Sequence, residues 1–565
     1  MKQNINWDFN MLQTPWLKTY ETLGIKHVEP ANRTMADYLA EHVRLRPDAP
    51  ALHYFMRSWS YAQVNADANR LANALRGLGV GPGDVVGFHM PNIPQYYLGL
   101  VAVSKLGAIG SGVSPLLAPP ELAHQISNAQ IKVLISFEPL SPAVSAMSAP
   151  GCLDTVIICG ARDMLDAPEV SVPQLDGVNA MSFSAAFDGT AETFADVKVD
   201  PEDTFMIQYT GGTTGKPKGA MLSHRTLLHN PIQTLALAPD VEIGKEIFVS
   251  AFPLFHVAGL CFSLMCVATG GSYECLPDPR DTDRFCDAMI ARPPSRIAAV
   301  PALYDMLVAN PKFAQVDFSQ IITASSGAAP MTKATHDAVV GIIGKPVMTD
   351  IFGMTETGPC HTSNPVKAPK AGSVGIPCVG AKIRIRDVET GDKDMPLGEI
   401  GEICSAGPQL MKGYLGLPEE SARALREIDG ERWMFTGDVG YMDEDGYVFL
   451  CDRAKDMLVV GGFKVFSVEV EDKLASLPMV AGSAVIGTPD TKRLGNDIVN
   501  LYVSLAPDYR EKDEDSLRAE LTAWIRENMA AYKVPKKIVF IDEIPLTPVG
   551  KIDKKKLRAE ALAAA

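Results

Sequence analysis

The hydrophobic pattern alternates between helical and strand-like segments along the first two-fifths of the chain. Apolar residues recur at helical spacing in "MADYLAEHVRLRP" and in "YAQVNADANRLANALRGLGV", and Gly77 and Gly79 mark the end of the second helix. Short apolar runs typical of buried strands lie between such helices: "GDVVGFHM", "KVLISF", "TVIICG", "TFMIQYT" and "EIFVSAF". This alternation predicts an α/β fold with mainly parallel sheets covered by helices.

The pattern changes from about residue 365. The stretches "GSVGIPCVGAKIRIRD", "GEIGEICSAG" and "DEDGYVFLCD" contain short strands separated by Gly and Asp turns, which indicates a small β-rich subdomain over about 365–451. Alternation then returns, with a helix over Asp515 to Met529, and this predicts a compact α+β unit. We therefore expect an N-terminal domain over 1–451, a junction at 452–456 and a C-terminal domain over 457–565.

The longest uncharged run, from Val249 to Ser272, has the length of a membrane span. Pro253, His256 and Gly259 argue against a continuous helix there. We interpret the run as a strand, a turn and a helix that are buried in a large core.

Composition narrows the class of protein. A chain of 565 residues is too long for one core, and 47% hydrophobic with 21% charged residues is typical of a globular protein. The net charge of −15 argues against nucleic acid as a partner. The ten cysteines include no C-x-x-C pair, and the first residues lack a signal sequence, so we expect a cytoplasmic protein without a transmembrane segment. Peripheral membrane association and oligomeric state stay open.

The glycine-rich stretch "YTGGTTGKPKG", Tyr209 to Gly219, has a composition that suits a triphosphate. It is not a standard P-loop, because the segment between Gly211 and Gly215 is one residue short and Pro217 stands where the magnesium-binding hydroxyl belongs. Alone, the stretch is explained either by a flexible turn or by another kind of phosphate loop.

Three further segments carry candidate chemistry. "IFGMTETGP" places the hydroxyl of Thr355 beside the carboxylate of Glu356, and a carboxylate near a triphosphate needs a hard cation between them. Alone, Glu356 would be better explained as a solvated loop acid. "FTGDVG" places Asp438 on a tight turn, where a carboxylate can accept the two hydroxyls of a ribose.

"PLTPVGKIDKKKLR" places Lys551 just before Asp553, which is a suitable N-cap for a basic helix. Alone, this position favours an exposed lysine in a basic tail.

Together, these segments closely resemble the adenylate-forming superfamily of acyl-CoA synthetases, luciferases and peptide-synthetase adenylation domains. The resemblance covers nearly the whole chain. Its motifs are "YTGGTTGKPKG", "FPLFHVAGL", "SSGAAPMT", "IFGMTETG", "FTGDVG", "DRAKDMLVVGGFKVFSVEVE" and "PLTPVGK".

The resemblance implies a role for each matching residue. It implies catalytic roles for Lys551, Thr355 and Glu356, with Glu356 as the Mg²⁺ ligand, and a hinge at Lys455 about which the C-terminal domain swings. The acyl group would meet His256, Val257, Gly259 and Gly327, and CoA would meet Gly461, Gly462 and Phe463. For His256, a role as a core histidine stays open. ATP or AMP would be bound by Thr210, Gly211, Gly212, Thr213, Thr214, Gly215, Lys216, Lys218, Gly327, Ala328, Ala329, Asp350, Ile351, Phe352, Gly353, Thr355, Asp438, Arg453 and Lys551.

This sequence departs from the family at one position of the adenine site. Most relatives have Gly-Tyr where this chain has Ile351 and Phe352, so stacking on the base is kept while a phenolic hydrogen bond is lost.

The resemblance implies an AMP-forming acyl-CoA synthetase that uses ATP, Mg²⁺, CoA and a carboxylic acid. His256 stands where amino-acid activators usually carry an aspartate, and this favours an acid without an α-amine. A medium- to long-chain fatty acid is the expected substrate, and an aromatic, cyclic or steroid side-chain acid is the alternative.

The residues also bear on three other classes of protein. Pro217 argues against a kinase or P-loop ATPase. The presence of Glu356, Asp438 and Lys551 argues against a binding protein without activity. A luciferase-like oxidase would form the same adenylate, so the motifs leave it open.

Overall fold

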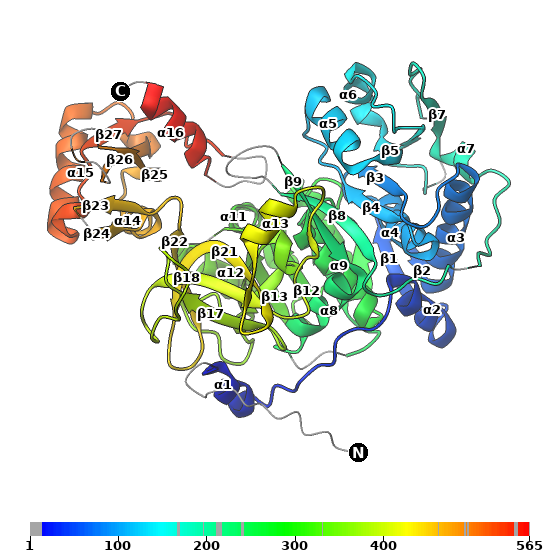
Figure 1. The fold of residues 1–565 in the computed structure, drawn as a ribbon, viewed down its shortest axis with the longest axis horizontal. Coiled ribbons are helices and arrows are strands. Elements are labelled where there is room, and N and C mark those ends of the chain that lie inside the picture. The colour runs from blue at the N-terminus through cyan, green and yellow to red at the C-terminus, as the bar shows by residue number, and fades with distance from the viewer. Residues whose placement is uncertain are drawn as a thin grey trace. The chain divides into compact units, whose positions relative to one another are not determined.

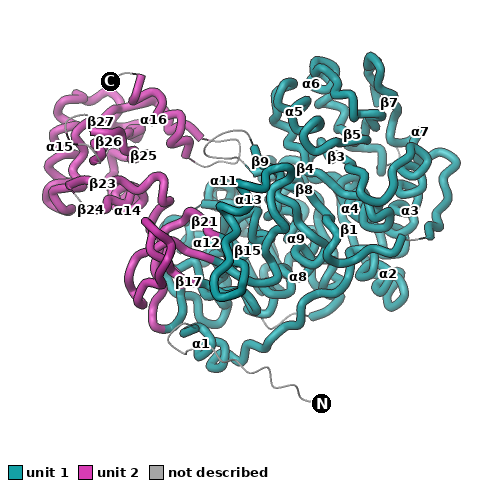
Figure 2. The backbone as a smooth tube through the Cα atoms, in the orientation of Figure 1, with its two compact units in different colours: residues 1–383, 405–434, 445–447 teal, residues 384–404, 435–444, 448–565 magenta. Residues whose placement is uncertain are grey.

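The computed structural model describes residues 14–165, 170–195, 197–210, 217–238, 242–329, 331–461, 463–490, 493, 496–546 and 552–563. The chain divides into two compact units (Figure 2). The first unit contains residues 1–383, 405–434 and 445–447, and the second contains residues 384–404, 435–444 and 448–565.

Two large sheets form the frame of the first unit. Among the described residues, one sheet has nine strands in the order β16 (Ile376–Pro377), β15 (Cys360–Ser363), β14 (Met348–Gly353), β13 (Thr323–Gly327), β12 (Arg296–Ala299), β10 (Ile247–Ser250), β11 (Ser272–Glu274), β1 (Pro50–Tyr54) and β2 (Arg57–Ser60). The other has eight, in the order β19 (Gly413–Tyr414), β9 (Lys218–Ser223), β8 (Thr204–Thr210), β4 (Ile109–Gly112), β3 (Val85–His89), β5 (Ile131–Phe137), β6 (Thr155–Cys159) and β7 (Asn179–Ser182). The central pairs of both sheets are parallel, and antiparallel pairs lie toward the edges.

Helices cover both sheets and fill the space between them (Figure 1). One large core contains side chains from both sheets and from α2 (Met35–Leu45), α3 (Tyr61–Gly77), α4 (Pro94–Leu106), α8 (His224–Leu235) and α9 (Val257–Thr269). A second core joins the nine-stranded sheet to α10 (Thr282–Ala291), α11 (Pro301–Ala309) and α12 (Lys333–Ile343). A third joins the eight-stranded sheet to α5 (Pro119–Ala129) and α6 (Ser141–Ala146). Shorter helices of this unit are α1 (Trp16–Leu23), α7 (Phe183–Phe187) and α13 (Pro418–Ala424).

The helices between the sheets are apolar on all sides, which is what burial from every direction requires. All residues of α4 are buried, and nearly all of α9 are as well. The helix α9 and the strand β10 before it account for the long uncharged run, so the interpretation as strand, turn and helix is confirmed. Within the described residues, no helix is both long and apolar enough to cross a membrane.

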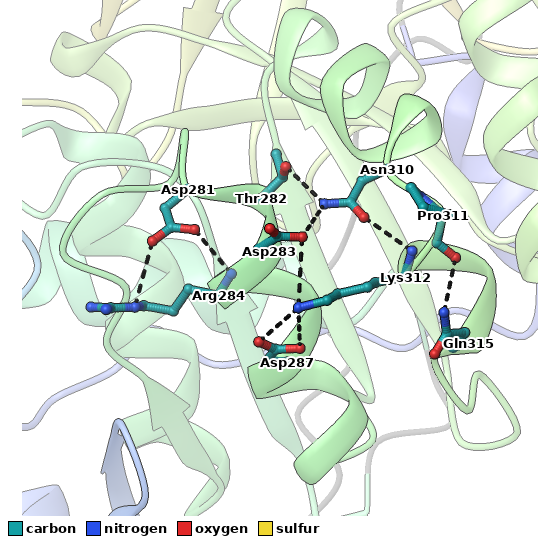
Figure 3. Close-up of polar contacts among 9 residues, drawn as sticks. All are labelled: Asp281, Thr282, Asp283, Arg284, Asp287, Asn310, Pro311, Lys312 and Gln315. Atoms are coloured by element: carbon teal, nitrogen blue, oxygen red, sulfur yellow. Dashed lines mark hydrogen bonds and ion pairs between the residues drawn. The ribbon is translucent and has the colours of Figure 1, made fainter.

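Exposed hydrogen bonds and ion pairs connect α10 to the segment after α11 (Figure 3). The ammonium of Lys312 lies 2.8 Å from a carboxylate oxygen of Asp287 and 3.6 Å from one of Asp283. The amide of Asn310 donates to Thr282 Oγ1 at 3.0 Å. Because the carboxylates are exposed, each of these contacts adds little to stability.

A third sheet has the strand order β17 (Lys382–Arg386), β18 (Gly401–Ala406), β21 (Glu431–Met442) and β20 (Leu425–Ile428), and β22 (Val448–Arg453) also pairs with β21. These strands lie in the segment predicted to be rich in β-structure. Two other strands of that segment pair elsewhere, because β16 extends the nine-stranded sheet and β19 extends the eight-stranded one.

The C-terminal part of the second unit is an α+β arrangement with its own core. It contains a hairpin of β23 (Leu458–Val460) and β24 (Phe463–Val465) and a sheet in the order β25 (Val480–Pro489), β26 (Asp497–Leu505) and β27 (Lys537–Phe540). Its helices are α14 (Ser467–Leu474), α15 (Glu514–Asn528) and α16 (Lys554–Ala563). The predicted cap of the basic helix is confirmed, because Lys556 N–H donates to Asp553 Oδ1 at 3.0 Å.

Candidate active site

The glycine-rich stretch connects two antiparallel strands of the first unit. Strand β8 ends at Thr210, β9 begins at Lys218, and these two residues are paired across the base of the connection. Thr210 and Lys218 therefore lie side by side. The predicted phosphate-binding residues between them, Gly211, Gly212, Thr213, Thr214, Gly215 and Lys216, lie outside the described residues.

The ammonium of Lys218 has an acidic partner and an aromatic neighbour. It lies 2.6 Å from Glu420 Oε2 and 5.0 Å from the centroid of the Tyr414 ring. Tyr414 is on β19, which pairs with β9, so the sheet itself places the tyrosine beside the base of the loop. The contact with Lys218 is the principal reason that the pKa of Glu420 is lowered.

The predicted adenine-facing residues lie at the carboxyl ends of two adjacent parallel strands, which is the usual edge for ligands in α/β sheets. Gly327 at the end of β13 is paired with Ile351 on β14. A Cβ atom on Gly327 would lie 3.1 Å from the carbonyl oxygen of Ile351, so a larger residue would crowd the strand. Ala328 has a φ of 69°, and the side chains of Ala328 and Ala329 are exposed. The two strands thus present an open backbone surface at this edge.

Phe352 lies on the same edge and is half-buried. Its ring centroid is 4.5 Å from that of His361, which is fully buried. Burial lowers the pKa of His361 to about 3, so this ring is neutral at physiological pH. Burial also raises the pKa of Asp350. Gly353 ends β14, where a Cβ atom would collide with the carbonyl oxygen of Pro359.

Thr355 and Glu356 form a short turn of 3₁₀-helix directly after β14, and both are buried. The hydroxyl of Tyr414 donates a hydrogen bond of 2.7 Å to Glu356 Oε1. The N–H of Met411 donates to the main-chain oxygen of Glu356 at 2.9 Å. Burial, and then the carboxylate of Glu356, raise the pKa of Tyr414, so its hydroxyl stays a donor. These contacts bring the end of β14 to the edge of the other sheet, beside Lys218.

This arrangement fits a magnesium ion that is shared with a nucleotide. Within the described residues, no group of three or more His, Cys, Asp or Glu side chains could hold a metal by itself. Mg²⁺ usually takes one or two carboxylates from a protein and completes its shell with water and phosphate oxygens. Glu356 is one carboxylate of this kind, and the hydrogen bond from Tyr414 orients it.

The predicted acyl-binding residues of the long apolar run lie at the start of α9. His256 precedes the helix and is half-buried, and its Nδ1 accepts a hydrogen bond from Ala258 N–H at 3.3 Å. Val257 belongs to the core. A Cβ atom on Gly259 would collide with the carbonyl oxygens of Pro253 and Phe252, so packing alone requires a glycine there. Of these three predicted residues, His256 is the most exposed.

Asp438 and Arg453 face each other on adjacent strands of the second unit. They are paired across β21 and β22, and Arg453 Nε lies 2.6 Å from Asp438 Oδ1. The Asp438 side chain is 7% exposed, so the arginine compensates a carboxylate that is largely removed from water. The predicted tight Thr-Gly-Asp turn is wrong, because these three residues all lie within the continuous strand β21, in which Gly437 has a φ of 71°. The ribose contact stays a prediction.

The predicted hinge and CoA-binding residues lie further along the second unit. Burial lowers the pKa of Lys455. Gly461 has a φ of 61° in the turn between β23 and β24, and its N–H donates to Asn496 Oδ1 at 2.6 Å. The exposed ring of Phe463 stacks on Tyr532, with 4.7 Å between the centroids. Gly462 and Lys551 lie outside the described residues.

No sequence pattern pointed to Tyr414 or Glu420. Tyr414 is 58 residues from Glu356 in the chain, and Glu420 is 202 residues from Lys218. Both belong to the stretch "GYLGLPEES", which has no spacing that indicates a metal or a phosphate. Only the pairing of β19 with β9 brings them to the site.

Comparisons with known proteins identify the family of this chain. The AMP-binding enzyme family matches residues 39–415, and the AMP-binding enzyme C-terminal domain matches residues 469–551. A long-chain-fatty-acid–CoA ligase of Bacillus subtilis is 34% identical over 97% of this chain and 98% of that protein. A feruloyl-CoA synthase of an Amycolatopsis species is 33% identical over 93% of this chain and 99% of that protein.

Solved structures agree as well. The crystal structure of an anthranilate CoA ligase in complex with anthranoyl-AMP superposes with a TM-score of 0.81 and 28% identity, and the match covers 95% of this chain and 98% of that one. The expected α/β fold, with a large domain of mainly parallel sheets and a smaller C-terminal domain, is confirmed by this likeness. The chain therefore belongs to the AMP-binding enzyme family, and this confirms the resemblance and the expected class of AMP-forming acid–thiol ligase.

Proposed function

We propose that this protein joins a medium- to long-chain fatty acid to coenzyme A, with ATP as the second substrate and an acyl-adenylate as the intermediate. The observation that carries the proposal is the similarity over 97% of the chain to a long-chain-fatty-acid–CoA ligase. The protein would act in the cytoplasm, which is consistent with the ten cysteines, none of which forms a disulfide.

The nucleotide would be bound by residues described above. Phe352 would stack on adenine, the backbone of Gly327 to Ala329 would face the base, and Asp438 would accept the ribose hydroxyls. Thr210, Lys218 and the residues between them would hold the β- and γ-phosphates. The proximity of Lys218 to Tyr414 and of Tyr414 to Glu356 supports this arrangement, because phosphates and their metal need both groups at one place.

The first step joins two anions, so charge is its main difficulty. A carboxylate oxygen of the acid attacks the α-phosphorus of ATP, the bond to the oxygen that bridges to the β-phosphorus breaks, and diphosphate leaves with the electron pair. Mg²⁺ held by Glu356 would supply positive charge to the phosphates. Thr355 would donate to the α-phosphate, and Lys551 would neutralise the charge that develops between the acid and the phosphate.

The second step transfers the acyl group to sulfur. The thiol of CoA attacks the acyl carbon of the adenylate, the bond to the phosphate oxygen breaks, AMP leaves, and the thiol proton passes to solvent. Lys551 would obstruct the thiol, so the C-terminal domain would rotate at Lys455 and bring Gly461, Gly462 and Phe463 to the CoA.

Release of diphosphate from ATP and Mg²⁺ tests the proposal. A panel of fatty, aromatic, steroid side-chain and amino acids is compared with and without CoA. We expect the highest kcat/KM for a medium- or long-chain fatty acid, and thioester only when CoA is added. If no acid releases diphosphate, the proposed activity is wrong.

A step-resolved experiment tests the role of Lys551. We expect Lys551→Ala to abolish adenylate formation and to spare thioester formation from a supplied acyl-adenylate and CoA. Lys555→Ala, which removes an exposed lysine of the same segment, is the matched control. Equal loss of both steps in Lys551→Ala would contradict the assignment.

An aromatic acid is the second candidate substrate. The specific observations that favour it are the feruloyl-CoA synthase at 33% identity and the structure of the anthranilate CoA ligase. A kcat/KM that is higher for cinnamic or benzoic acids than for fatty acids would decide for this alternative.

A further inference from the structure

Helix α16 begins three residues after Lys551. One face of this helix packs against other elements of the second unit. The residues of this face are Lys554, Leu557, Arg558 and Ala561, which follow the spacing of neighbours on a helix. Leu557 and Ala561 are buried in a small core with residues of β25 and β26. The two basic residues of this face reach acidic groups on other elements.

Lys554 has two partners on α14. Its ammonium lies 2.8 Å from Glu471 Oε1 and donates to Ser467 Oγ at 2.5 Å. The side chains of Lys554 and Glu471 are each 12% exposed. A pair so far from water resists separation, because either charge left alone would be poorly solvated.

The same contacts continue to the predicted hinge segment, residues 452–456. The N–H and the hydroxyl of Ser467 both donate to Asp452 Oδ2, the hydroxyl at 2.7 Å. At the other end of the segment, Arg558 Nη2 lies 2.8 Å from Asp456 Oδ1. Lys455 thus lies between two carboxylates that are each connected to α16, one directly and one through Ser467.

The residues just before and just after the segment 547–551, which contains Lys551, also contact each other. Leu546 and Ile552 form an antiparallel bridge, and Asp553 N–H donates to the carbonyl oxygen of Pro545 at 2.7 Å. A displacement of the start of α16 would therefore be passed to residues on both sides of 547–551.

We propose that Lys554 and Glu471 are a positioning pair that sets the catalytic lysine, Lys551, relative to the hinge. This inference rests on the proposed role of Lys551 in adenylation. The pair holds the first turn of α16 against α14, so Ile552 and Asp553 before the helix are kept at a fixed place relative to residues 452–456. Without the pair, Lys551 would no longer be held in position for adenylation. The thioester step does not use Lys551, so its rate should not change.

The pair also makes positioning sensitive to pH. Burial raises the pKa of Glu471 to about 7, and Lys554 and the N–H of Val485 partly oppose this. Asp452 raises it further. Asp472, the next residue of α14, is also influenced by Lys554, and burial raises the pKa of this carboxyl. The carboxyl of Glu471 is therefore fully ionised, and the ion pair with Lys554 fully formed, only above about pH 7. We expect the adenylation rate to increase as pH rises through that value.

The experiment compares Lys554→Met with Lys555→Met in the full chain. Lys555 is the exposed neighbour on the same helix, so its variant removes the same charge without touching Glu471. We expect Lys554→Met to slow diphosphate release by about 10- to 100-fold, the range expected when a catalytic group is misplaced by about 1 Å. Lys555→Met should change it by no more than about twofold, as for most surface substitutions. Thioester formation from a supplied acyl-adenylate should change little in either variant.

Four further measurements separate positioning from a loss of folding. Lys554→Arg should restore part of the adenylation rate. Glu471→Gln, which keeps the shape of the side chain, should remove the rise of that rate through about pH 7. The double variant Glu471→Gln, Lys554→Met should be no slower than Lys554→Met alone, because both changes break one interaction. Thermal unfolding of each variant shows whether it is folded at the assay temperature.

The outcomes distinguish this inference from the proposed function. If Lys554→Met slows both half-reactions equally, or matches Lys555→Met, the pair does not position Lys551 and the inference is wrong. If Lys551→Ala itself keeps the adenylation rate, the proposed role of Lys551 fails, whatever Lys554 does.

Discussion

The hydrogen bond from Tyr414 to Glu356 supports the sharpest prediction about the metal site. Tyr414→Phe removes one oxygen atom and keeps the ring that lies 5.0 Å from the ammonium of Lys218. We expect the variant to need more Mg²⁺ for half-maximal diphosphate release, because Glu356 is then free to rotate away from the phosphates.

The structure sets the magnitude of this effect. The bond is 2.7 Å long, its acceptor is a carboxylate, and Tyr414 and Glu356 are 7% and 5% exposed. A hydrogen bond to a charged group contributes about 1.5–3 kcal/mol. Second-sphere partners of metal ligands change affinity or activity by about 10- to 100-fold. Because both side chains are buried, water cannot easily replace the hydroxyl. We therefore expect the change in Mg²⁺ affinity to lie in the upper part of the range of about 10- to 100-fold.

The assay is a Mg²⁺ titration at fixed ATP, with initial rates of diphosphate release. Tyr447→Phe is the matched control, since it removes a hydroxyl that donates 2.6 Å to the main-chain oxygen of Ala368 instead. Stabilisation of the protein by Mg²⁺ and ATP in thermal unfolding gives a second readout that does not depend on turnover. An unchanged Mg²⁺ dependence in Tyr414→Phe would show that Glu356 needs no help from this tyrosine, or does not bind the metal.

The remaining predictions concern the nucleotide and pH. Asp438→Ala should raise the KM for ATP by about tenfold or more, since hydrogen bonds to a charged group are lost and Arg453 loses its partner. Phe352→Ala should raise the KM for ATP about 5- to 100-fold, the range for loss of one stacked base, whereas Phe352→Tyr should stay near the parent value. The pKa of Glu471 is raised from 4.5 to about 7, so its contribution to stability is present below about pH 4.5 and is lost as pH rises through about 7. The Tm of Glu471→Gln should therefore vary less than the parent's between these values.

Each of these predictions has a result that would contradict it. Asp438→Ala with an unchanged KM for ATP would remove the carboxylate from the ribose site. A Phe352→Ala variant that binds ATP as well as the parent would show that the ring does not stack on adenine. Parallel Tm curves for the parent and Glu471→Gln would show that this carboxyl titrates near its ordinary pKa.

Local sequence patterns predicted most of the elements. The five apolar runs interpreted as buried strands became β3, β5, β6, β8 and β10. The helices expected from the pattern at residues 35–47, 61–80 and 515–529 became α2, α3 and α15. These predictions were correct because the period of apolar residues along the chain reports directly which face of a helix or strand is buried.

The sequence predicted the individual motifs of the site but not the contacts that bring them together. The glycine-rich loop and Glu356 could be recognised because the residues that define each motif lie within about ten positions of one another in the sequence. Tyr414 and Glu420 could not, because the pairing of β19 with β9 alone brings them to Glu356 and Lys218. The same is true of Lys554, whose partner Glu471 lies on another helix.

The sequence by itself determined the alternation of helices and strands, the buried character of the run from Val249 to Ser272, and the family motifs. The tertiary structure decided which sheet each short strand joins, since β16 and β19 extend two different large sheets. It also decided which charged groups face one another across long separations in the chain. The physical reason is that periodicity and turn chemistry act between neighbours in sequence, whereas strand pairing and buried ion pairs depend on segments that only the folded chain brings together.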